Sequence, residues 1–208
     1  MPLLTKIRRI QRYLFDWTVQ HHPGLDLEGR AEFFVQRFER HLPKSAQVLD
    51  IGGSWGFYGA PLEQRGHQYT VLDVVKPAFH RAPVVLYSPG EKFPLPDRSF
   101  DASLIITVLH HIDDPESVLR EAVRVTRGIV VVIEDLYHHP VGRWWTKLRD
   151  QIYNFEYFGH PGQFRSREEW LATFKKLGLE LIEDQKVYTW LSGLRILNGI
   201  FILRVPAR

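Results

Sequence analysis

The sequence predicts an α/β fold: a Rossmann-like doubly wound sheet, mostly parallel with an antiparallel last strand, with helices on both faces. Short apolar runs alternate with helix-like stretches between residues 46 and 135, which indicates parallel strands joined by right-handed crossovers. The runs are continuously apolar, as expected for strands that helices cover on both sides. The length of 208 residues suits one domain.

The composition excludes several classes of protein. Hydrophobic residues make up 44% and charged residues 25% of the chain, a balance typical of soluble globular proteins. Cysteine is absent, which excludes disulfides, zinc–thiolate sites and thiol nucleophiles. The net charge of +3 comes without a dense Lys/Arg run, so nucleic acid is not the expected partner. No apolar run approaches the roughly 18 residues that a membrane span needs, and no secretory signal is evident, so we expect a cytoplasmic protein.

The N-terminal segment is expected to be helical. Residues 1–20 place apolar residues at offsets of three and four, and a second helix is expected from Asp26 to His41, before Pro43. The apolar positions of the first helix are Leu3, Ile7, Ile10, Leu14 and Trp17, and its basic residues are Lys6, Arg8, Arg9 and Arg12. Such a helix could lie on an anionic membrane as a peripheral contact. We favour a lid over the cofactor site.

The elements that follow alternate along the chain. The expected strands are Ala46–Ile51, Tyr69–Asp73, Val84–Tyr87, Phe100–Val108 and Ile129–Ile133. The expected helices are Gly56–Gly66 and one that starts with Asp114 as its cap and Pro115 at its first position, and stops at Gly128. We interpret residues 1–208 as a single domain, with 1–43 as the lid and 44–135 as the cofactor-binding half.

Residues 136–208 are interpreted as an acceptor-side insert and the final strands. Residues 137–165 are rich in Trp, Tyr and Phe, and Ser166 and Glu169 form a capping box for a helix that reaches about Leu177. Two last strands are expected at Leu179–Tyr188 and Gly199–Val205. The turn between them is expected at Ser192-Gly193 or Asn198-Gly199, which would pair them antiparallel.

The stretch Val48–Gly56 carries the most specific signal. It is a buried strand that ends in Asp50 and a glycine-rich turn, which presents backbone N–H groups to a ligand. The dinucleotide pattern G-x-G-x-x-G is absent, because Trp55 stands where its second glycine would be. A carboxylate at Asp50 would repel a pyrophosphate and attract an ammonium group. Asp73 ends the next strand, where an acid can accept hydrogen bonds from ribose hydroxyls; the alternative is a solvated strand-end acid.

These residues resemble a known family. Leu49–Gly56 is similar to the first motif of class I S-adenosylmethionine-dependent methyltransferases, and more closely to that of their type 11 (ubiquinone/menaquinone-biosynthesis-like) group. The stretches GEKFPLPDRSFD at 90–101 and TVLHHIDDP at 107–115 are similar to that group's next two signatures. The resemblance covers residues 46–135 and implies methyl transfer with S-adenosylmethionine as the cofactor.

The resemblance also implies roles for individual residues. The turn residues would surround the methionine half of the cofactor: Asp50, Gly52, Gly53, Ser54 and Gly56. The other expected contacts are Asp73 to the ribose, Val74 and Glu91 beside the adenine, and Thr107 at the methionine end. Two residues depart from the family pattern. Ser54 stands where a glycine is common, and Pro89 stands where an acid often binds the adenine amino group.

Candidate catalytic residues follow the predicted strand ends. A hydroxyl acceptor would need a base, since it must lose a proton to become nucleophilic. The candidate bases are His110 or His111, Glu134, and His138 or His139, and of these we select His111, Glu134 and His138. A structural histidine and a strand-end cap are equally good interpretations of His111 and Glu134. The spacing of Glu134, Asp135, His138 and His139 matches no firm metal motif, so no metal is expected.

The expected function is methyl transfer to a small-molecule acceptor, aromatic or lipid-like, by in-line displacement. The alternative is a non-catalytic member of the same fold that binds the cofactor or a partner. A nicotinamide-dependent oxidoreductase is disfavoured by the missing dinucleotide pattern and by Asp50. Which acceptor atom is methylated does not follow from the residues.

Overall fold

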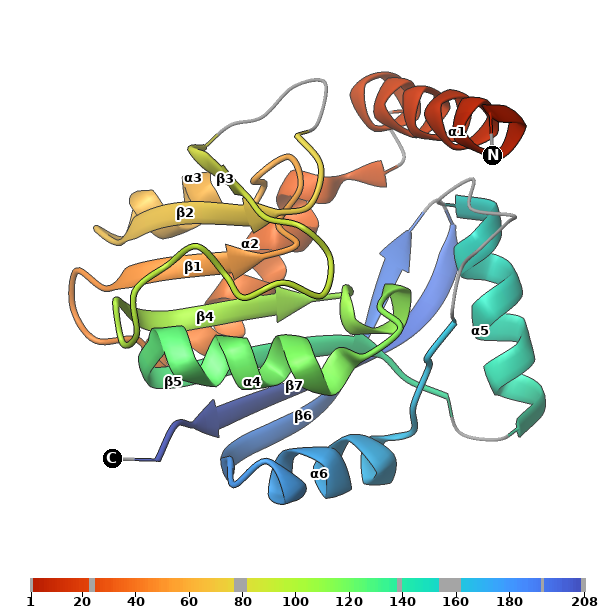
Figure 1. The fold of residues 1–208 in the computed structure, drawn as a ribbon. Helices are drawn as coiled ribbons and strands as arrows, with labels where there is room; N and C mark the ends of the chain where they lie inside the picture. Colours follow the sequence, from red (N-terminus) through yellow and green to blue (C-terminus); the bar gives the residue numbers. More distant parts are fainter. Residues whose placement is uncertain are drawn as a thin grey trace.

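The computed structural model describes residues 2–22, 25–76, 82–137, 140–153, 162–191 and 193–206. Within these ranges the strands form one seven-stranded sheet in the order β3-β2-β1-β4-β5-β7-β6 (Figure 1). The strands are β1 Gln47–Ile51, β2 Gln68–Asp73, β3 Val84–Leu86, β4 Phe100–Ile106, β5 Thr126–Asp135, β6 Glu180–Leu191 and β7 Leu194–Arg204. Strands β1 to β5 pair in parallel, and β7 runs antiparallel between β5 and β6. The predicted sheet is confirmed.

Helices cover both faces of the sheet, as predicted. They are α1 Pro2–His21, α2 Leu27–Phe38, α3 Gly59–Glu63, α4 Pro115–Val125, α5 Pro140–Tyr153 and α6 Arg167–Lys176, with short 3-10 turns at Glu39–His41 and Leu109–His111. One buried cluster packs α4 and α6 against the sheet, and a second packs α2 and α3 against the other face. Each face therefore has its own apolar core.

The two capped helices begin where the sequence places them. Asp114 accepts a hydrogen bond from the Ser117 amide at 3.1 Å, and Pro115 occupies the first turn of α4. Ser166 and Glu169 form the reciprocal capping box of α6. Both caps satisfy amide groups that a helix start leaves without partners.

Three expected boundaries are wrong. The helix expected at Gly56–Gly66 is confined to Gly59–Glu63, because Gly56 adopts a left-handed φ of +78° and prolongs the turn. Helix α4 ends at Val125 and β5 starts at once, so Gly128 lies within a strand instead of ending the helix. The last strand starts at Leu194 instead of Gly199, so Asn198 and Gly199 lie inside β7. The hairpin turns between Leu191 and Leu194, which fits the other expected turn, Ser192-Gly193; Gly193 lies there with a φ of +80°, and Ser192 lies outside the described residues.

The sheet order places a crevice between two strand ends. From β1 the chain builds outward through β2 and β3, whereas β4 and β5 add to the other side of β1. Ligands of open α/β sheets bind at the carboxyl ends of strands where the order reverses in this way. The carboxyl ends of β1 and β4 are therefore the place to look for a site. Among the described residues, no helix combines the length and apolarity that crossing a bilayer requires.

Candidate functional site

The glycine turn after β1 lies against the ends of two other strands. The Gly52 amide donates to the Leu72 carbonyl at 2.7 Å, and Gly52 has a φ of +74°. A Cβ at Gly52 would come within 2.7 Å of the Val108 side chain, and one at Gly53 within 2.5 Å of the Asp50 carboxylate. Only glycine allows this approach. Ser54 adopts a φ of +46°, so the serine takes a left-handed conformation within the turn.

Asp73 joins the end of β2 to this turn. Its Oδ2 accepts a hydrogen bond from the Ser54 amide and its Oδ1 accepts one from the Val75 amide, both at 3.0 Å. The Asp73 side chain is largely buried, which is against the interpretation of a solvated strand-end acid. A carboxylate has about four acceptor sites, so two remain for hydroxyl donors. Val74, the next residue, is exposed beside it.

Asp50 is a buried acid at the end of β1. The Tyr69 hydroxyl donates a hydrogen bond to its Oδ2. Burial raises the pKa of Asp50 from 3.8 to about 7; the Tyr69 hydrogen bond opposes this shift, and the nearby charge of Asp73 adds to it. A cation near Asp50 would favour its ionised form. The site therefore contains a carboxyl group that titrates near neutral pH.

Thr107 and Glu91 lie on two other segments, and of the two it is Thr107 that lies next to the turn. Thr107 follows β4 with a φ of +54°, and its amide donates to the Ile133 carbonyl at 2.7 Å. Its neighbour Val108 is the residue that packs on Gly52. The exposed Glu91 follows a segment that is tied to β2, since the Tyr87 amide donates to the Asp73 carbonyl at 3.1 Å.

Glu134 lies at the end of β5 and is fully buried. Its Oε1 accepts hydrogen bonds from the Val108 amide at 2.9 Å and the Leu109 amide at 2.7 Å. Its Oε2 lies 2.6 Å from Nδ1 of His110. These contacts fix the loop after β4 to β5, so the geometry favours a supporting role for Glu134 over the removal of a proton from an acceptor.

His110 is held between two acids. Its Nε2 lies 3.5 Å from Oδ1 of Asp150 on α5, and its ring stacks on Phe164 with centroids 4.5 Å apart. Burial disfavours the charged ring, but the charge of Glu134 and the hydrogen bonds to both acids raise the pKa of His110 well above its usual value. An imidazolium buried between two carboxylates is the expected state.

His111 is half-buried next to this group, with its ring centroid 4.2 Å from that of His110. Nitrogen and oxygen atoms of His110, His111 and Asp150 lie within 4.8 Å of one another, a spacing that a metal ion could also use. His110 already has a close ion-pair partner in Glu134, at 2.6 Å, so the geometry does not require a metal. His138, the third catalytic candidate, and His139 lie outside the described residues.

We expect Glu134→Gln to lower the free energy of unfolding by about 3 kcal/mol, because it breaks a buried ion pair. Urea denaturation at neutral pH measures this. Glu180→Gln is the matched control, since Glu180 pairs with Arg204 at 3.0 Å on the surface, where such pairs contribute about 1 kcal/mol or less. An unchanged stability together with lost activity would contradict the supporting role and favour catalysis.

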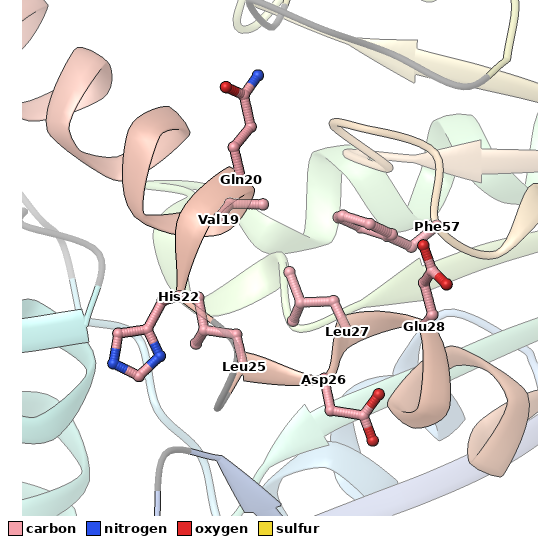
Figure 2. Close-up of a pocket in the computed structure, with 8 residues that line it drawn as sticks. All are labelled: Val19, Gln20, His22, Leu25, Asp26, Leu27, Glu28 and Phe57. Atoms are coloured by element: carbon pink, nitrogen blue, oxygen red, sulfur yellow. The ribbon is translucent and has the colours of Figure 1, made fainter.

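Helix α1 touches the glycine turn directly. The indole Nε1 of Trp55 donates to Oδ1 of Asp16 at 3.2 Å, and both side chains are buried. A cavity of about 500 Å³ lies next to this contact (Figure 2). It is lined by Val19, Gln20, His22, Leu25, Asp26, Leu27, Glu28 and Phe57. Phe57 belongs to the same turn as Trp55, so the cavity adjoins the candidate cofactor site (Figure 2).

Sequence reasoning missed several of these residues. No motif surrounds Asp16 in the first predicted helix, Tyr69 in the second predicted strand or Asp150 in the aromatic-rich insert. The same holds for a buried network in which Asn198 of β7 donates to Oδ1 of Asp135 at 2.6 Å and Arg149 of α5 pairs with the other oxygen. For the charged residues among them, the sequence offered one indication: an acid or arginine within an otherwise apolar element is expected to have a buried partner.

Residues 49–132 match a family model described as a methyltransferase domain. An uncharacterized methyltransferase of Mycobacterium sp. (strain JLS) is 32% identical over 108 residues, 48% of this chain and 43% of that protein. A demethylmenaquinone methyltransferase of Paenarthrobacter aurescens (strain TC1) is 32% identical over 110 residues, 49% of this chain and 43% of that protein. The matched stretch spans less than half of each of these relatives.

A solved structure agrees over a larger part of the chain. A SAM-dependent methyltransferase from Thermotoga maritima superimposes with a TM-score of 0.65 at 20% identity, covering 94% of this chain and 100% of that one. At this identity the likeness establishes the fold. The resemblance drawn from the three motifs and the Rossmann-like architecture are both confirmed.

Proposed function

We propose that this chain, whose residues 49–132 match a methyltransferase-domain model, transfers a methyl group from S-adenosylmethionine to a small-molecule acceptor by in-line displacement. The observation that carries the proposal is the Gly52–Gly56 turn, held by Asp73 through the Ser54 amide. The turn brings bare backbone, a buried acid and a strand-end carboxylate together at the crevice of the sheet.

The residues present fit this cofactor. Gly52 and Gly53 leave room that a Cβ would fill, and Asp73 keeps acceptor sites for the two ribose hydroxyls. Asp50 and the turn would hold the charged methionine end, with Thr107 close by. When bound, S-adenosylmethionine supplies an electrophilic methyl group on a sulfonium. The chain's part is to align the acceptor and to keep water away.

Helix α1 is proposed as the lid of this site. Its Asp16 holds Trp55, which stands in the middle of the cofactor turn. The cavity beside this contact is bounded by α1, α2 and Phe57, which would place an acceptor or part of the cofactor under the helix (Figure 2). Residues 1–43 would then act as a cover, with 44–135 binding the cofactor and 136–208 contributing to the acceptor side.

We expect Asp16→Ala to weaken the binding of S-adenosylhomocysteine by about tenfold, because it removes the buried hydrogen bond that seats α1 on the turn. Calorimetric titration measures the affinity. Thr18→Ala is the control on the same helix, since the Thr18 hydroxyl donates to the Leu14 carbonyl at 2.8 Å, within α1 itself. Wild-type affinity in the Asp16 variant would contradict the lid.

The acceptor is proposed to be an aromatic or lipid-like small molecule. The aromatic-rich segment around α5 and the turn at 162–166 approach the site through Asp150 and Phe164, which contact His110. His111 is the described candidate for a general base, since it is half-buried beside this group and Glu134 is fully engaged. A quinol is one acceptor to include, because a relative is named for a demethylmenaquinone.

The test is the formation of S-adenosylhomocysteine with quinols, phenols, amines and lipids as acceptors, followed by mass spectrometry. Turnover with one class of acceptor would support the proposal. Loss of this turnover in His111→Gln at pH 7, with partial recovery at higher pH, would support His111 as the general base. Binding of the cofactor without turnover on any class would favour the non-catalytic alternative.

A further inference from the structure

Helix α1 packs with its apolar face outward. Ile10, Tyr13, Leu14 and Trp17 are spaced for one helical face, yet Tyr13 is 68% and Trp17 53% exposed. Among the α1 side chains that the structure describes, the buried one is the charged Asp16, which accepts a hydrogen bond from Trp55. A surface helix of a globular protein normally buries its apolar stripe. The reverse arrangement leaves a stripe of large apolar side chains exposed, without cover from the described parts of the chain.

Helix α5 repeats this arrangement. It buries the polar side chains of Thr146, Arg149 and Asp150 and exposes apolar ones on another face. The exposed set is Val141, Trp144, Trp145 and Ile152, with Trp144 65% exposed. Arg149 and Asp150 are held by Asp135 and His110, so the orientation of α5 is fixed by buried ion pairs. Its apolar face therefore points outward as a consequence of specific contacts.

The end of the β6–β7 hairpin adds a third apolar element. Tyr188, Trp190 and Leu194 are exposed there, and the Arg195 guanidinium stacks on the Tyr188 ring at 3.6 Å. Helices α1 and α5 and this hairpin end all lie at the side of the molecule toward which the parallel strands point (Figure 1). We call these eleven exposed side chains the apolar rim. They are eleven of the fifteen large hydrophobic side chains exposed in the described part of the chain, so the exposure is concentrated at one end.

We propose that the apolar rim docks the protein on an anionic lipid bilayer, with α1 and α5 lying in the headgroup region. Trp and Tyr are the residues that favour this region, and four of the six tryptophans of the chain are in the rim. The charge is complementary to anionic lipid: the α1 sequence carries four basic residues against one acid, Asp16, which is buried toward the protein. Exposed Arg143 and Arg195 lie within the two other elements.

The surface chemistry favours a bilayer over another protein as the occupant. A protein interface gathers its apolar residues into one packed, desolvated centre and is depleted in lysine. Here the exposed tryptophans and tyrosines are distributed over three separate elements that also contain the exposed Arg143 and Arg195, and the α1 sequence includes a lysine and three arginines, the composition of interfacial helices. Docking would turn the carboxyl end of the sheet, and with it the proposed site, toward the membrane.

The full-length chain is tested by co-sedimentation with vesicles of pure phosphatidylcholine and with vesicles that contain about 25% phosphatidylglycerol, without cofactor. We expect binding to the anionic vesicles, a blue shift of tryptophan fluorescence, and weaker binding as salt increases. Trp144→Gln/Trp145→Gln and Leu14→Gln/Trp17→Gln should each lower the partition by about tenfold. Leu181→Gln, an exposed apolar residue near the amino end of β6, should bind like the wild type.

Three results would overturn the proposal: no binding to anionic vesicles, equal binding to neutral and anionic vesicles, or a dimer in light scattering that the same double substitutions dissociate while vesicles bind nothing. The last would assign the rim to a second copy of the chain. The measurement needs neither cofactor nor acceptor, so its failure and the failure of the proposed methyl transfer are separate outcomes.

Discussion

Asp73→Asn is expected to weaken the binding of S-adenosylhomocysteine by about a hundredfold, as measured by calorimetric titration. The Asp73 carboxylate accepts two backbone N–H bonds, from Ser54 and Val75, and would accept the ribose hydroxyls with its remaining sites. An amide keeps the shape but replaces one acceptor oxygen with a donor nitrogen that faces an N–H group. Both the turn and the ribose contact are weakened together.

Asp101→Asn is the matched control for this substitution. Asp101 also accepts a backbone N–H bond, from Gln47 at 2.9 Å, but it lies near the amino end of β4, at the opposite edge of the sheet. Its loss should leave the affinity for S-adenosylhomocysteine unchanged. Equal losses in both variants would mean that Asp73 acts only through the stability of the sheet.

The affinity for S-adenosylhomocysteine is expected to fall as the pH is lowered from 8 to 6. The pKa of Asp50 is raised to about 7 by burial, and its ionised form is the one that attracts the ammonium group of the ligand. Protonation below pH 7 removes that charge, so the affinity should drop by up to about tenfold for each pH unit below 7. In Asp50→Asn the binding should be weak and lose this pH dependence. A flat profile in the wild type would contradict the role of Asp50.

The same substitution has an opposite effect on stability. Because the folded-state pKa of Asp50 lies above its usual 3.8, the folded protein holds a proton that the unfolded chain releases, and stability is lost as the pH rises from about 4 to about 7. Asp50→Asn should therefore raise the free energy of unfolding by about 4 kcal/mol at pH 8 and by almost nothing at pH 4. Urea denaturation at both values measures this. The buried Asp50 carboxylate therefore lowers the stability of the folded protein at neutral and higher pH, which is consistent with a role in binding a ligand.

The sequence allowed the sheet and the cofactor turn to be predicted because their signals are local. A continuous apolar run such as 129–133 identifies a strand, and the capping residues Asp114 and Ser166 identify helix starts. The boundaries at Gly56 and Gly128 were wrong for one reason. In a sequence, a glycine that ends a helix cannot be distinguished from one that lets a neighbouring strand come close. At Gly128 the close neighbour is the Asp101 carbonyl oxygen, which would lie 2.6 Å from a Cβ added at Gly128.

The acid–histidine group could not be predicted in the same way. His110 and Glu134 were candidates as strand-end residues, but their pairing depends on the register of β4 and β5, and Asp150 comes from a helix of the insert. The structure also distinguishes two neighbouring histidines. His110 is buried between two acids, whereas His111 is half-buried beside it. Long-range contacts of this kind leave no periodic trace in a sequence.

The central claim is that the turn after β1 binds S-adenosylmethionine, and calorimetric titration of the wild-type chain with S-adenosylmethionine, S-adenosylhomocysteine and NAD tests it most directly. The structure predicts binding of the first two and none of NAD, since Trp55 replaces a glycine of the dinucleotide pattern and Asp50 would repel a pyrophosphate. Binding of NAD alone, or of no ligand by a protein shown to be folded, would contradict it.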